Sequence, residues 1–581
     1  MAWNIVHVTH EAVQKMGGIG TVLEGLLTAK AYQKAVRRSI LVGPLLSPSE
    51  EANLSETGRV LFSSISGAGD DRTAQILEPV VRDYNVNLVY GTRVVRGNER
   101  AVEAEVLLVD AADLNPRIER NFKFNLYRHL GLESDRYETV DDYLLYLNIA
   151  EAAYEAVKRL LKRSSGPHFV LAHEYMGVPV ALKAHLDRDP KFRTVFYAHE
   201  VSTVRDLIEA DAGHDIRIYN LMDRALSLGL SLDDVFGDYS AFYRHALVCQ
   251  THHLDAIFAV GDLVVQELHF LDPAFQTSAI QRVYNGVPAL QVDWESRSGS
   301  RKLLQEYAQN LVGITPDVIF THVTRPVISK AIWRDFRVLG HLDTMFAAEA
   351  MSGVFFILSS GFGQRSEADI LSMEAEYGWP VGHQLGAPDL VGPEEDIWRA
   401  LWEFNRQATA IQAVFVNQFG WDRKSCGKRM PAQMGFENLR LGTDVEFGQS
   451  IYEPFGIAAL EPLSSGALCV VSSKSGCLGF VDQVAGGAKS RNLVVADYVT
   501  LREERDLDSL RELGAAERDW IEGERSWEVA SQVMDRLPHS DQDRAALIEE
   551  GYKLAKKMSW ERVCEDQFLP GLKRLEGIER S

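Results

Sequence analysis

The sequence is poor in cysteine, with five among 581 residues and no Cys-x-x-Cys pair. This scarcity argues against a disulfide framework or a zinc site and favours a reducing cytoplasm. No apolar run approaches the roughly 18 residues of a membrane helix. Basic residues are outnumbered, 61 against 82, and the net charge of −21 argues against nucleic acid or an anionic membrane as partner. We therefore expect a cytoplasmic protein whose anionic ligands, if any, need a local basic pocket.

What is present is the composition of a large globular protein. Hydrophobic residues make up 46% of a chain that is too long for a single core, so we expect two large domains. The opening residues 1–8 predict a first β-strand and lack the basic start of a signal peptide. Short apolar runs then alternate with helical stretches, such as residues 21–34, which indicates parallel βαβ units in a doubly wound sheet.

The same alternation recurs in the second half, and the boundary is expected near the turn signal Asn285-Gly-Val-Pro288. Residues 1–288 then form an N-terminal Rossmann-like domain and residues 289–550 a second one. Residues 360–440 are the least periodic part of the chain. Two such domains would face each other across a cleft. Ligands would bind there, at the carboxyl ends of the parallel strands. The predicted strands are 5–9, 39–42, 169–172, 194–197, 318–323, 354–359, 414–417 and 468–472.

The segment Ser450-Ile-Tyr-Glu453-Pro-Phe-Gly-Ile-Ala-Ala-Leu-Glu461 is the most informative part of the chain. Pro454 suits the first position of a helix, and residues eight apart could then face one ligand across two turns. The free N–H groups of that helix start would attract an anion. A nucleotide sugar, which carries both phosphate and hydroxyl groups, fits this pattern. An ordinary amphipathic helix start is the alternative.

Two cations follow the predicted strand 318–323. Arg325 and Lys330 would emerge at its carboxyl end, where two fixed charges can stabilise a departing diphosphate without a metal.

Asp187-x-Asp189 and Asp541-x-Asp543 have the spacing of a metal motif but stand in polar segments, and we interpret them as surface residues. Gly17 and Gly18 allow close approach of a phosphate to the backbone, although a plain strand–helix turn also uses glycine. No Gly-x-Gly-x-x-Gly fingerprint supports NAD.

Several segments in order resemble the glycogen and starch synthases, and more widely the retaining GT-B glycosyltransferases. They are Lys15-Met-Gly17-Gly18-Ile, His173-Glu-Tyr-Met, Tyr-Ala-His199, Asn285-Gly286-Val-Pro, Arg325-x4-Lys330, Glu453-x7-Glu461 and Met558-Ser-Trp-Glu-Arg. The resemblance covers most of the chain except residues 205–280 and 335–440. The Arg-x4-Lys and Glu-x7-Glu motifs stand farther apart than is expected from bacterial glycogen synthases, which implies an insertion around 335–440 in the second domain. It implies a GT-B fold in which a C-terminal helix, residues 551–581, crosses back onto the first domain.

The resemblance also implies roles for these residues. His199 would hydrogen-bond the donor sugar, Glu453 would contact its hydroxyls near the anomeric carbon, and Glu461 would accept hydrogen bonds from the ribose. Glu174 stands where the family usually has Asp, so a direct role is not expected there. The catalytic set is Glu453, Arg325, Lys330 and His199, and the substrate-binding set is Lys15, Gly17, Gly18, Phe455, Gly456, Ile457 and Glu461.

The implied activity is retaining transfer of glucose from ADP- or UDP-glucose to the non-reducing end of an α-1,4-glucan. No cofactor or metal is expected, and the partners are the nucleotide sugar and the glucan. One alternative is a retaining transferase that uses another nucleotide sugar and a small acceptor, as sucrose- or trehalose-type synthases do. A non-catalytic sugar-binding protein on the same fold is the other alternative.

Overall fold

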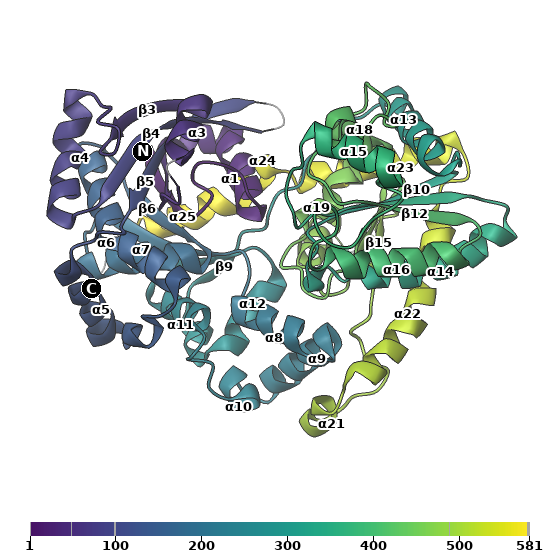
Figure 1. The fold of residues 1–581 in the computed structure, drawn as a ribbon. Coiled ribbons are helices and arrows are strands. Elements are labelled where there is room, and N and C mark those ends of the chain that lie inside the picture. Colours follow the sequence, from purple (N-terminus) through teal and green to yellow (C-terminus); the bar gives the residue numbers. More distant parts are fainter. Residues whose placement is uncertain (1, 48, 98–99, 487–488, 578–581) are drawn as a thin grey trace. The chain divides into compact units, whose positions relative to one another are not determined.

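The computed structural model describes residues 2–47, 49–97, 100–486 and 489–577, and the chain divides into two compact units (Figure 1). The first unit comprises Met1–Val204, Ala225–Gly286 and Trp560–Ser581, and the second comprises Arg205–Arg224 and Val287–Ser559. The main change of unit therefore falls at the Asn-Gly-Val-Pro turn. Sequence patterns did not indicate that the short stretch 205–224 belongs to the second unit.

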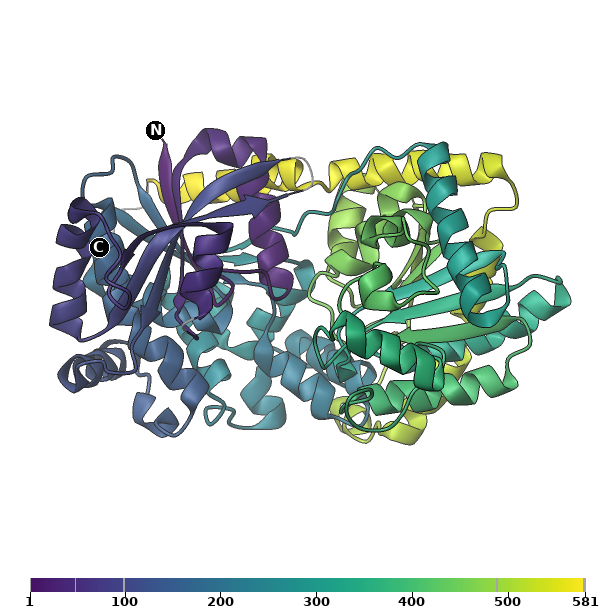
Figure 2. The same cartoon turned by 45° about the horizontal axis from the view of Figure 1, so that its top comes forward.

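The first unit is built on a nine-stranded sheet, counted over the described residues, in the order β3-β4-β5-β2-β1-β6-β7-β8-β9. Strands β1, β2 and β5 to β9 pair in parallel, whereas β3 and β4 add antiparallel pairs at one edge. This antiparallel edge, which includes the long strands in purple and blue in Figure 2, was not predicted. The strands are β1 (Trp3–Val8), β2 (Val36–Pro44), β3 (Gly58–Ser63), β4 (Asn87–Arg96), β5 (Ala101–Asp110), β6 (His168–His173), β7 (Phe192–Ala198), β8 (Ala256–Ala259) and β9 (Ile280–Arg282).

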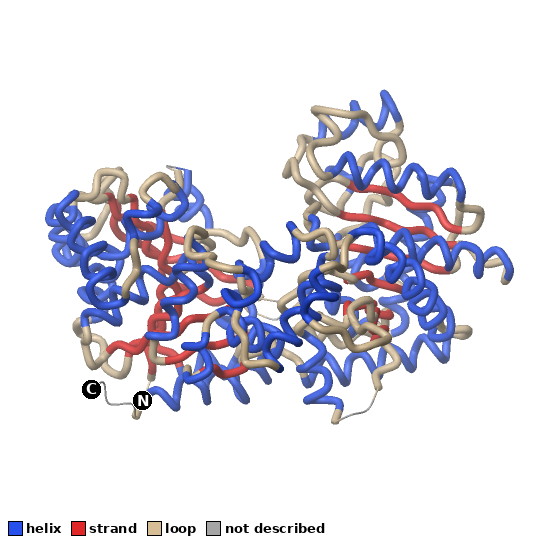
Figure 3. The backbone as a smooth tube through the Cα atoms, turned by 90° about the horizontal axis from the view of Figure 1, so that it is seen from below, coloured by secondary structure: helices blue, strands red, loops and turns tan. Residues whose placement is uncertain are grey.

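Helices cover both faces of this sheet, as the blue and red tube of Figure 3 shows. Fully buried apolar side chains on the strands, such as Ile5 and Phe169, form the core beneath them. The helices are α1 (Gly18–Thr28), α2 (Lys30–Ala35), α3 (Ser49–Thr57), α4 (Asp71–Tyr84), α5 (Pro116–Leu130), α6 (Asp141–Leu161), α7 (Glu174–Asp187), α8 (Ser202–Ala210), α9 (His214–Ser227), α10 (Leu232–Phe236), α11 (Tyr243–Cys249) and α12 (Asp262–Leu271), of which α8 and α9 run across the division between the units.

The C-terminal segment belongs to the first unit, as the crossover expectation requires. It contains α24 (Trp560–Val563) and α25 (Leu569–Leu575), drawn in yellow against the purple and blue elements in Figure 1. The carboxylate of Glu561 accepts the backbone N–H groups of Lys30 and Ala31 at 2.7 and 2.8 Å. Because these bonds cap a new helix start, the single helix expected over residues 21–34 is instead divided into α1 and α2 at Ala29, whose backbone is extended.

The second unit contains an all-parallel, six-stranded sheet among its described residues, in the order β12-β11-β10-β13-β14-β15. Its strands are largely apolar because both faces of the sheet are buried. The region 335–440, where an insertion was expected, supplies β11 and β12 of this sheet. The strands are β10 (Val318–Val323), β11 (Gly353–Leu358), β12 (Ile411–Val416), β13 (Val445–Gly448), β14 (Leu468–Ser472) and β15 (Leu493–Ala496).

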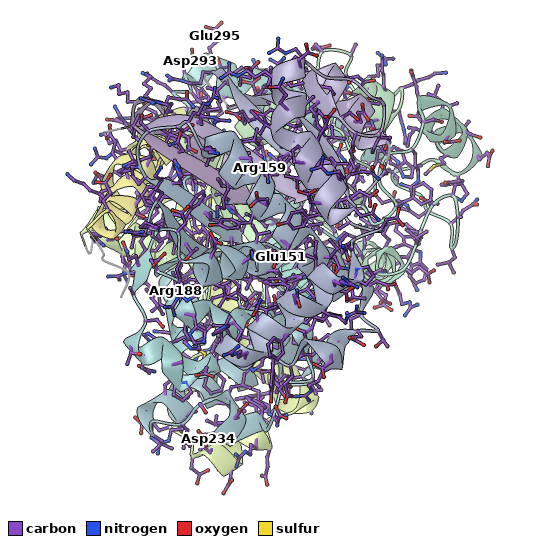
Figure 4. All side chains as sticks on the ribbon, turned by 90° about the vertical axis from the view of Figure 1, so that its left-hand side faces the viewer. Glu151, Arg159, Arg188, Asp234, Asp293 and Glu295 are labelled. Atoms are coloured by element: carbon purple, nitrogen blue, oxygen red, sulfur yellow. The ribbon has the colours of Figure 1, made fainter. Side chains whose placement is uncertain are left out.

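Several helices in this unit begin at a capping side chain. Asp293, labelled in Figure 4, accepts the backbone N–H of Ser296 at 2.7 Å and so begins α13. Across the described part of the chain, no helix is long and apolar enough to span a bilayer. The helices are α13 (Trp294–Val312), α14 (Ile332–Ala348), α15 (Glu367–Tyr377), α16 (Glu394–Gln407), α17 (Arg423–Cys426), α18 (Phe436–Gly442), α19 (Ile457–Leu460), α20 (Cys477–Ala485), α21 (Leu507–Arg511), α22 (Ala515–Arg536) and α23 (Asp541–Lys557).

Candidate functional site

In the second unit, two of the predicted catalytic residues are in contact at the carboxyl ends of the central strands. Lys330 lies in the short 3-10 turn after β10, and Glu453 lies in the loop after β13. The Nζ of Lys330 is 2.6 Å from Oε2 of Glu453, and each side chain is less than one-fifth exposed. The two residues are 123 positions apart in the sequence, and the fold brings them into contact. A cation and a carboxylate are thus held together at the edge where parallel sheets bind ligands.

Arg325 differs from Lys330 in its surroundings. Its side chain is exposed, and within the described residues its guanidinium makes no ion pair. It is the second residue after β10, so its charge is available at the same strand end as Lys330. This arrangement offers one exposed cation and one cation paired with Glu453 to an anionic ligand.

The loop that carries Glu453 is fixed by backbone contacts on two sides. The Ile451 N–H donates to the Ser329 carbonyl at 2.9 Å, and the Gly476 N–H donates to the Glu453 carbonyl at 3.0 Å. A Cβ on Gly476 would lie 1.7 Å from the carbonyl oxygen of Pro454, so only glycine permits this approach. The loop therefore places the Glu453 backbone rigidly beside Lys330.

The helix expected to start at Pro454 is not formed there. The structure begins α19 at Ile457, and Gly456 precedes it with φ of +94°, a left-handed conformation that favours glycine. The helix is one turn long, and Glu461 already lies in the following 3-10 turn. The prediction that both glutamates face a ligand from two turns of one helix was therefore wrong, because contacts of the loop with residues 475–477 hold it out of helical geometry.

The predicted nucleotide-binding residues of this loop have mixed environments. The Phe455 side chain is buried, and its carbonyl accepts the Cys477 N–H at 3.0 Å, whereas Gly456 and Ile457 are at the start of α19. Glu461 is paired with Arg440, whose Nη2 lies 2.7 Å from Oε2. If Glu461 accepts hydrogen bonds from a ribose, as expected, it must do so while it is paired with Arg440.

Arg440 and Glu446 were missed by sequence reasoning. Arg440 Nη1 is 2.9 Å from Glu446 Oε2, and Glu446, fully buried on β13, also accepts the Val323 N–H at 3.1 Å. Burial raises the pKa of the Glu446 carboxyl, and the Arg440 charge acts in the opposite direction. The position of Glu446 between apolar residues of β13 could have indicated a buried ion pair, because a buried carboxylate needs a partner. Nothing in the sequence marked Arg440.

In the first unit, His199 follows β7 and is half-buried. Its backbone N–H and that of Glu200 both donate to Oε1 of Glu174, at 2.5 and 2.7 Å. Glu174 itself has φ of +61°, a strained conformation for a residue with a side chain. Glu174, for which no direct role was expected, therefore orients the turn that carries His199. Burial lowers the pKa of His199 from 6.5 to about 3, so its imidazole is neutral near pH 7.

The glycine loop lies at the start of α1. The Glu11 carboxylate accepts the N–H groups of Met16 and Gly17 at 2.6 and 2.7 Å, so the Gly17 amide, expected to approach a phosphate, is bonded to a protein carboxylate. Gly18 opens onto space, since a Cβ there would meet nothing within 4 Å. Lys15 is half-exposed and pairs with Glu24 at 2.8 Å. An anion at this loop would have to displace or adjoin these carboxylates.

A further cluster in the first unit joins helices α6, α7 and α11. The hydroxyl of Tyr175 donates to Asp142 at 2.9 Å, and the Arg244 guanidinium lies 4.6 Å from the centroid of the Tyr175 ring. Arg244 also bonds the hydroxyl of Tyr243 at 2.8 Å. Tyr175 directly follows Glu174, so the cluster lies close to the turn of His199. The residues stand far apart in the sequence and gave no pattern.

No group of three or more metal-ligating side chains occurs in the parts of the chain that the structure describes. The two Asp-x-Asp pairs have structural partners: Asp187 pairs with Lys158 at 2.7 Å, and Asp543 bonds Ser540 in the cap of α23.

No protein-family model and no curated protein matches this sequence. The whole chain nevertheless resembles solved structures. One is described as trehalose-6-phosphate from E. coli bound with UDP-2-fluoro glucose, with a TM-score of 0.50, 12% identity and 99% of each chain covered. Another is an α,α-trehalose-phosphate synthase (UDP-forming) from Burkholderia xenovorans in complex with glucose-6-phosphate, with a TM-score of 0.50, 12% identity and coverage of 99% and 100%.

At this identity the likeness shows the fold, and it extends over the full chain. The fold predicted from the sequence, two Rossmann-like domains of the GT-B type, is therefore confirmed. The Burkholderia neighbour is described as a trehalose-phosphate synthase, whereas the motifs resembled glycogen and starch synthases. The chain has the GT-B fold of these solved structures.

Proposed function

We propose that this protein is a retaining glycosyltransferase that moves a hexosyl group from a nucleotide sugar, UDP-glucose first among the candidates, to a small sugar-phosphate acceptor. The observation that carries the proposal is the contact between Lys330 and Glu453 at 2.6 Å, at the carboxyl end of the second sheet. The fold neighbours support the substrate class, since one is described with UDP-2-fluoro glucose and another with glucose-6-phosphate. They support the small-acceptor alternative better than an α-1,4-glucan acceptor.

The proposed reaction breaks the bond between the anomeric carbon and the diphosphate oxygen. A bond from the acceptor oxygen to the same carbon forms on the same face, and the acceptor proton passes to the leaving phosphate. Arg325 and Lys330 stabilise the charge that develops on the diphosphate, and the Glu453 carboxylate stabilises the cationic sugar. Neutral His199 binds a hydroxyl of the donor sugar, and Glu461 the ribose. Fixed cations of this kind supply the charge stabilisation that a metal ion would otherwise give.

The direct test presents UDP-glucose and ADP-glucose separately with glucose-6-phosphate, with glycogen, and without acceptor. We expect release of UDP that depends on glucose-6-phosphate, and an α-configured product by NMR. Release that depends on glycogen would instead establish glucan synthesis. Binding of UDP-glucose by calorimetry without any turnover would establish the non-catalytic alternative, and neither binding nor turnover would refute all three.

A matched pair of variants tests the site. Lys330→Ala removes a charge-assisted contact to the diphosphate, so UDP affinity should fall roughly 10- to 100-fold, the equivalent of one hydrogen bond to a charged group. Lys183→Ala is the control, because Lys183 forms a similar half-buried pair with Glu151 at 2.9 Å in the first unit. Equal UDP affinity in the two variants would refute the role of Lys330.

A further inference from the structure

A continuous chain of hydrogen bonds leads from the interior of the first unit to His199. The Nε2 of His199 is 2.8 Å from Nδ1 of His173, and Nε2 of His173 is 2.9 Å from Nδ1 of His7. The Nε2 of His7 is 3.0 Å from the hydroxyl of Tyr32, which in turn is 2.9 Å from the hydroxyl of Ser39. The five groups come from β1, α2, β2, β6 and the end of β7, and no sequence spacing connects them.

The interior members of this chain are fully shielded from water. His7, Tyr32 and His173 have no exposed surface. The rings of His173 and His199 are stacked at 12° with centroids 5.1 Å apart, and the Tyr197 ring stacks on His199 at 4.6 Å. A flipped or rotated imidazole would break a hydrogen bond that water cannot replace. The packing therefore fixes the plane of the His199 ring.

The electrostatic surroundings favour neutral rings throughout. Burial lowers the pKa of His7 to about 3 and that of His173 well below 6.5, and the neighbouring histidines, His10 included, lower the latter further. Burial raises the pKa of the Tyr32 hydroxyl and that of the nearby Cys564 thiol, so both groups stay protonated at neutral pH. Each imidazole in the chain then has one N–H and one acceptor nitrogen.

With one proton per bond, only two arrangements satisfy every contact. If the Tyr32 hydroxyl donates to His7, then all three histidines carry their proton on Nδ1. If His199 donates inward, all three carry it on Nε2. A mixed set would place two N–H groups, or two lone pairs, face to face in a dry interior, which costs free energy.

We propose that His7 and His173 are positioning residues that, with Tyr32, set the orientation and the tautomer of His199 as a single cooperative unit. The Nδ1 of His199, which has no hydrogen bond to a described residue, is the nitrogen left for a ligand. It is a donor in one arrangement and an acceptor in the other. A sugar hydroxyl both donates and accepts, so it can bind either form. This ligand role rests on the proposed function, whereas the coupled tautomers do not.

The test is long-range ¹⁵N–¹H NMR of the histidine rings in the full-length protein labelled with ¹⁵N-histidine, free and with UDP-glucose. Signals are assigned with His7→Gln, His173→Gln and His199→Gln variants. We expect His7, His173 and His199 to share one tautomer and to stay neutral at pH 6. A mixed set of tautomers, or a protonated ring among the three, would overturn the proposal. This measurement needs no transferase activity, so it is independent of the proposed reaction.

Tyr32→Phe tests the coupling, with Tyr143→Phe as the matched control. Both tyrosines are fully buried and bond a serine hydroxyl, Tyr143 bonding Ser134 at 2.7 Å outside the chain. Tyr32→Phe should change the tautomer balance of His199 and raise the KM for the donor about 2- to 10-fold, the equivalent of one neutral hydrogen bond. A His199 tautomer that is the same in both variants would refute the coupling. Altered tautomers without any sugar transfer would refute only the proposed function.

Discussion

Replacing Arg334 by methionine should destabilise the second unit, because this arginine neutralises two carboxylates in a dry interior. Its Nη1 and Nη2 are 3.0 and 2.7 Å from the two oxygens of Asp215, and its Nε is 2.9 Å from Oε1 of Glu522. All three side chains are fully buried. Asp215 lies on α9, in the stretch 205–224, which this contact ties to α14 and α22.

The magnitude follows from the loss of the cation that contacts both acids, although Arg337 stays 3.4 Å from Oε2 of Glu522. Removing one partner of a buried ion pair costs about 3–5 kcal/mol, since the remaining charge is uncompensated. Burial already raises the pKa of Asp215, and Arg334 opposes that shift. Without Arg334 the pKa of Asp215 should rise further, so the loss of stability should shrink as the pH falls and the carboxyl takes up a proton.

The assay is urea unfolding of wild type and Arg334→Met at pH 7.5 and 5.5, with hydrogen exchange followed on peptides from 205–224. We expect faster exchange there and a smaller stability loss at the lower pH. The triple variant with Asp215→Asn and Glu522→Gln should regain part of the stability, because it buries no charge. A loss below about 1 kcal/mol with unchanged exchange would refute the reasoning, since that is the scale of an exposed pair.

Further outcomes follow from the same structure. Glu453→Gln should nearly abolish transfer in a protein that keeps its circular dichroism spectrum, and near-wild-type turnover would remove Glu453 from the mechanism. Gly476→Ala should lower activity and stability together, because its Cβ would collide with the carbonyl of Pro454; an unchanged crystal structure of that loop would contradict this. The pKa values of His7 and His199, about 3 when folded against 6.5 unfolded, mean that only the unfolded chain gains these protons as the pH falls. Each histidine should therefore cost about 2 kcal/mol of stability at pH 5, and a His7→Gln variant should show a shallower pH dependence in urea titrations. EDTA should leave sugar transfer unchanged, and strong inhibition restored by a divalent cation would contradict charge stabilisation by side chains alone.

The sequence by itself predicted much of the parallel core of both units, although β5, β8, β9, β13 and β15 were missed. Strands buried on both faces are largely apolar, so β10 and β14 were predicted at their observed bounds, and β6 and β7 within two residues of theirs. The resemblance in motifs also named Lys330 and Glu453, which the structure brings into contact. Local pattern was sufficient for these features because hydrophobic periodicity reports burial directly.

Only the tertiary structure decided where long-range partners lie. The break between α1 and α2 depends on Glu561, over 500 residues away, and the loop of Glu453 is held out of a helix by residues 475–477. Likewise, Glu11 occupies the amides of the glycine loop, Arg440 pairs with Glu461, and His7 reaches His199 through His173. Each of these contacts joins side chains or backbone groups whose separation in sequence has no period. Such partners are selected by burial and hydrogen bonding in the folded core, which the local pattern of residues does not encode.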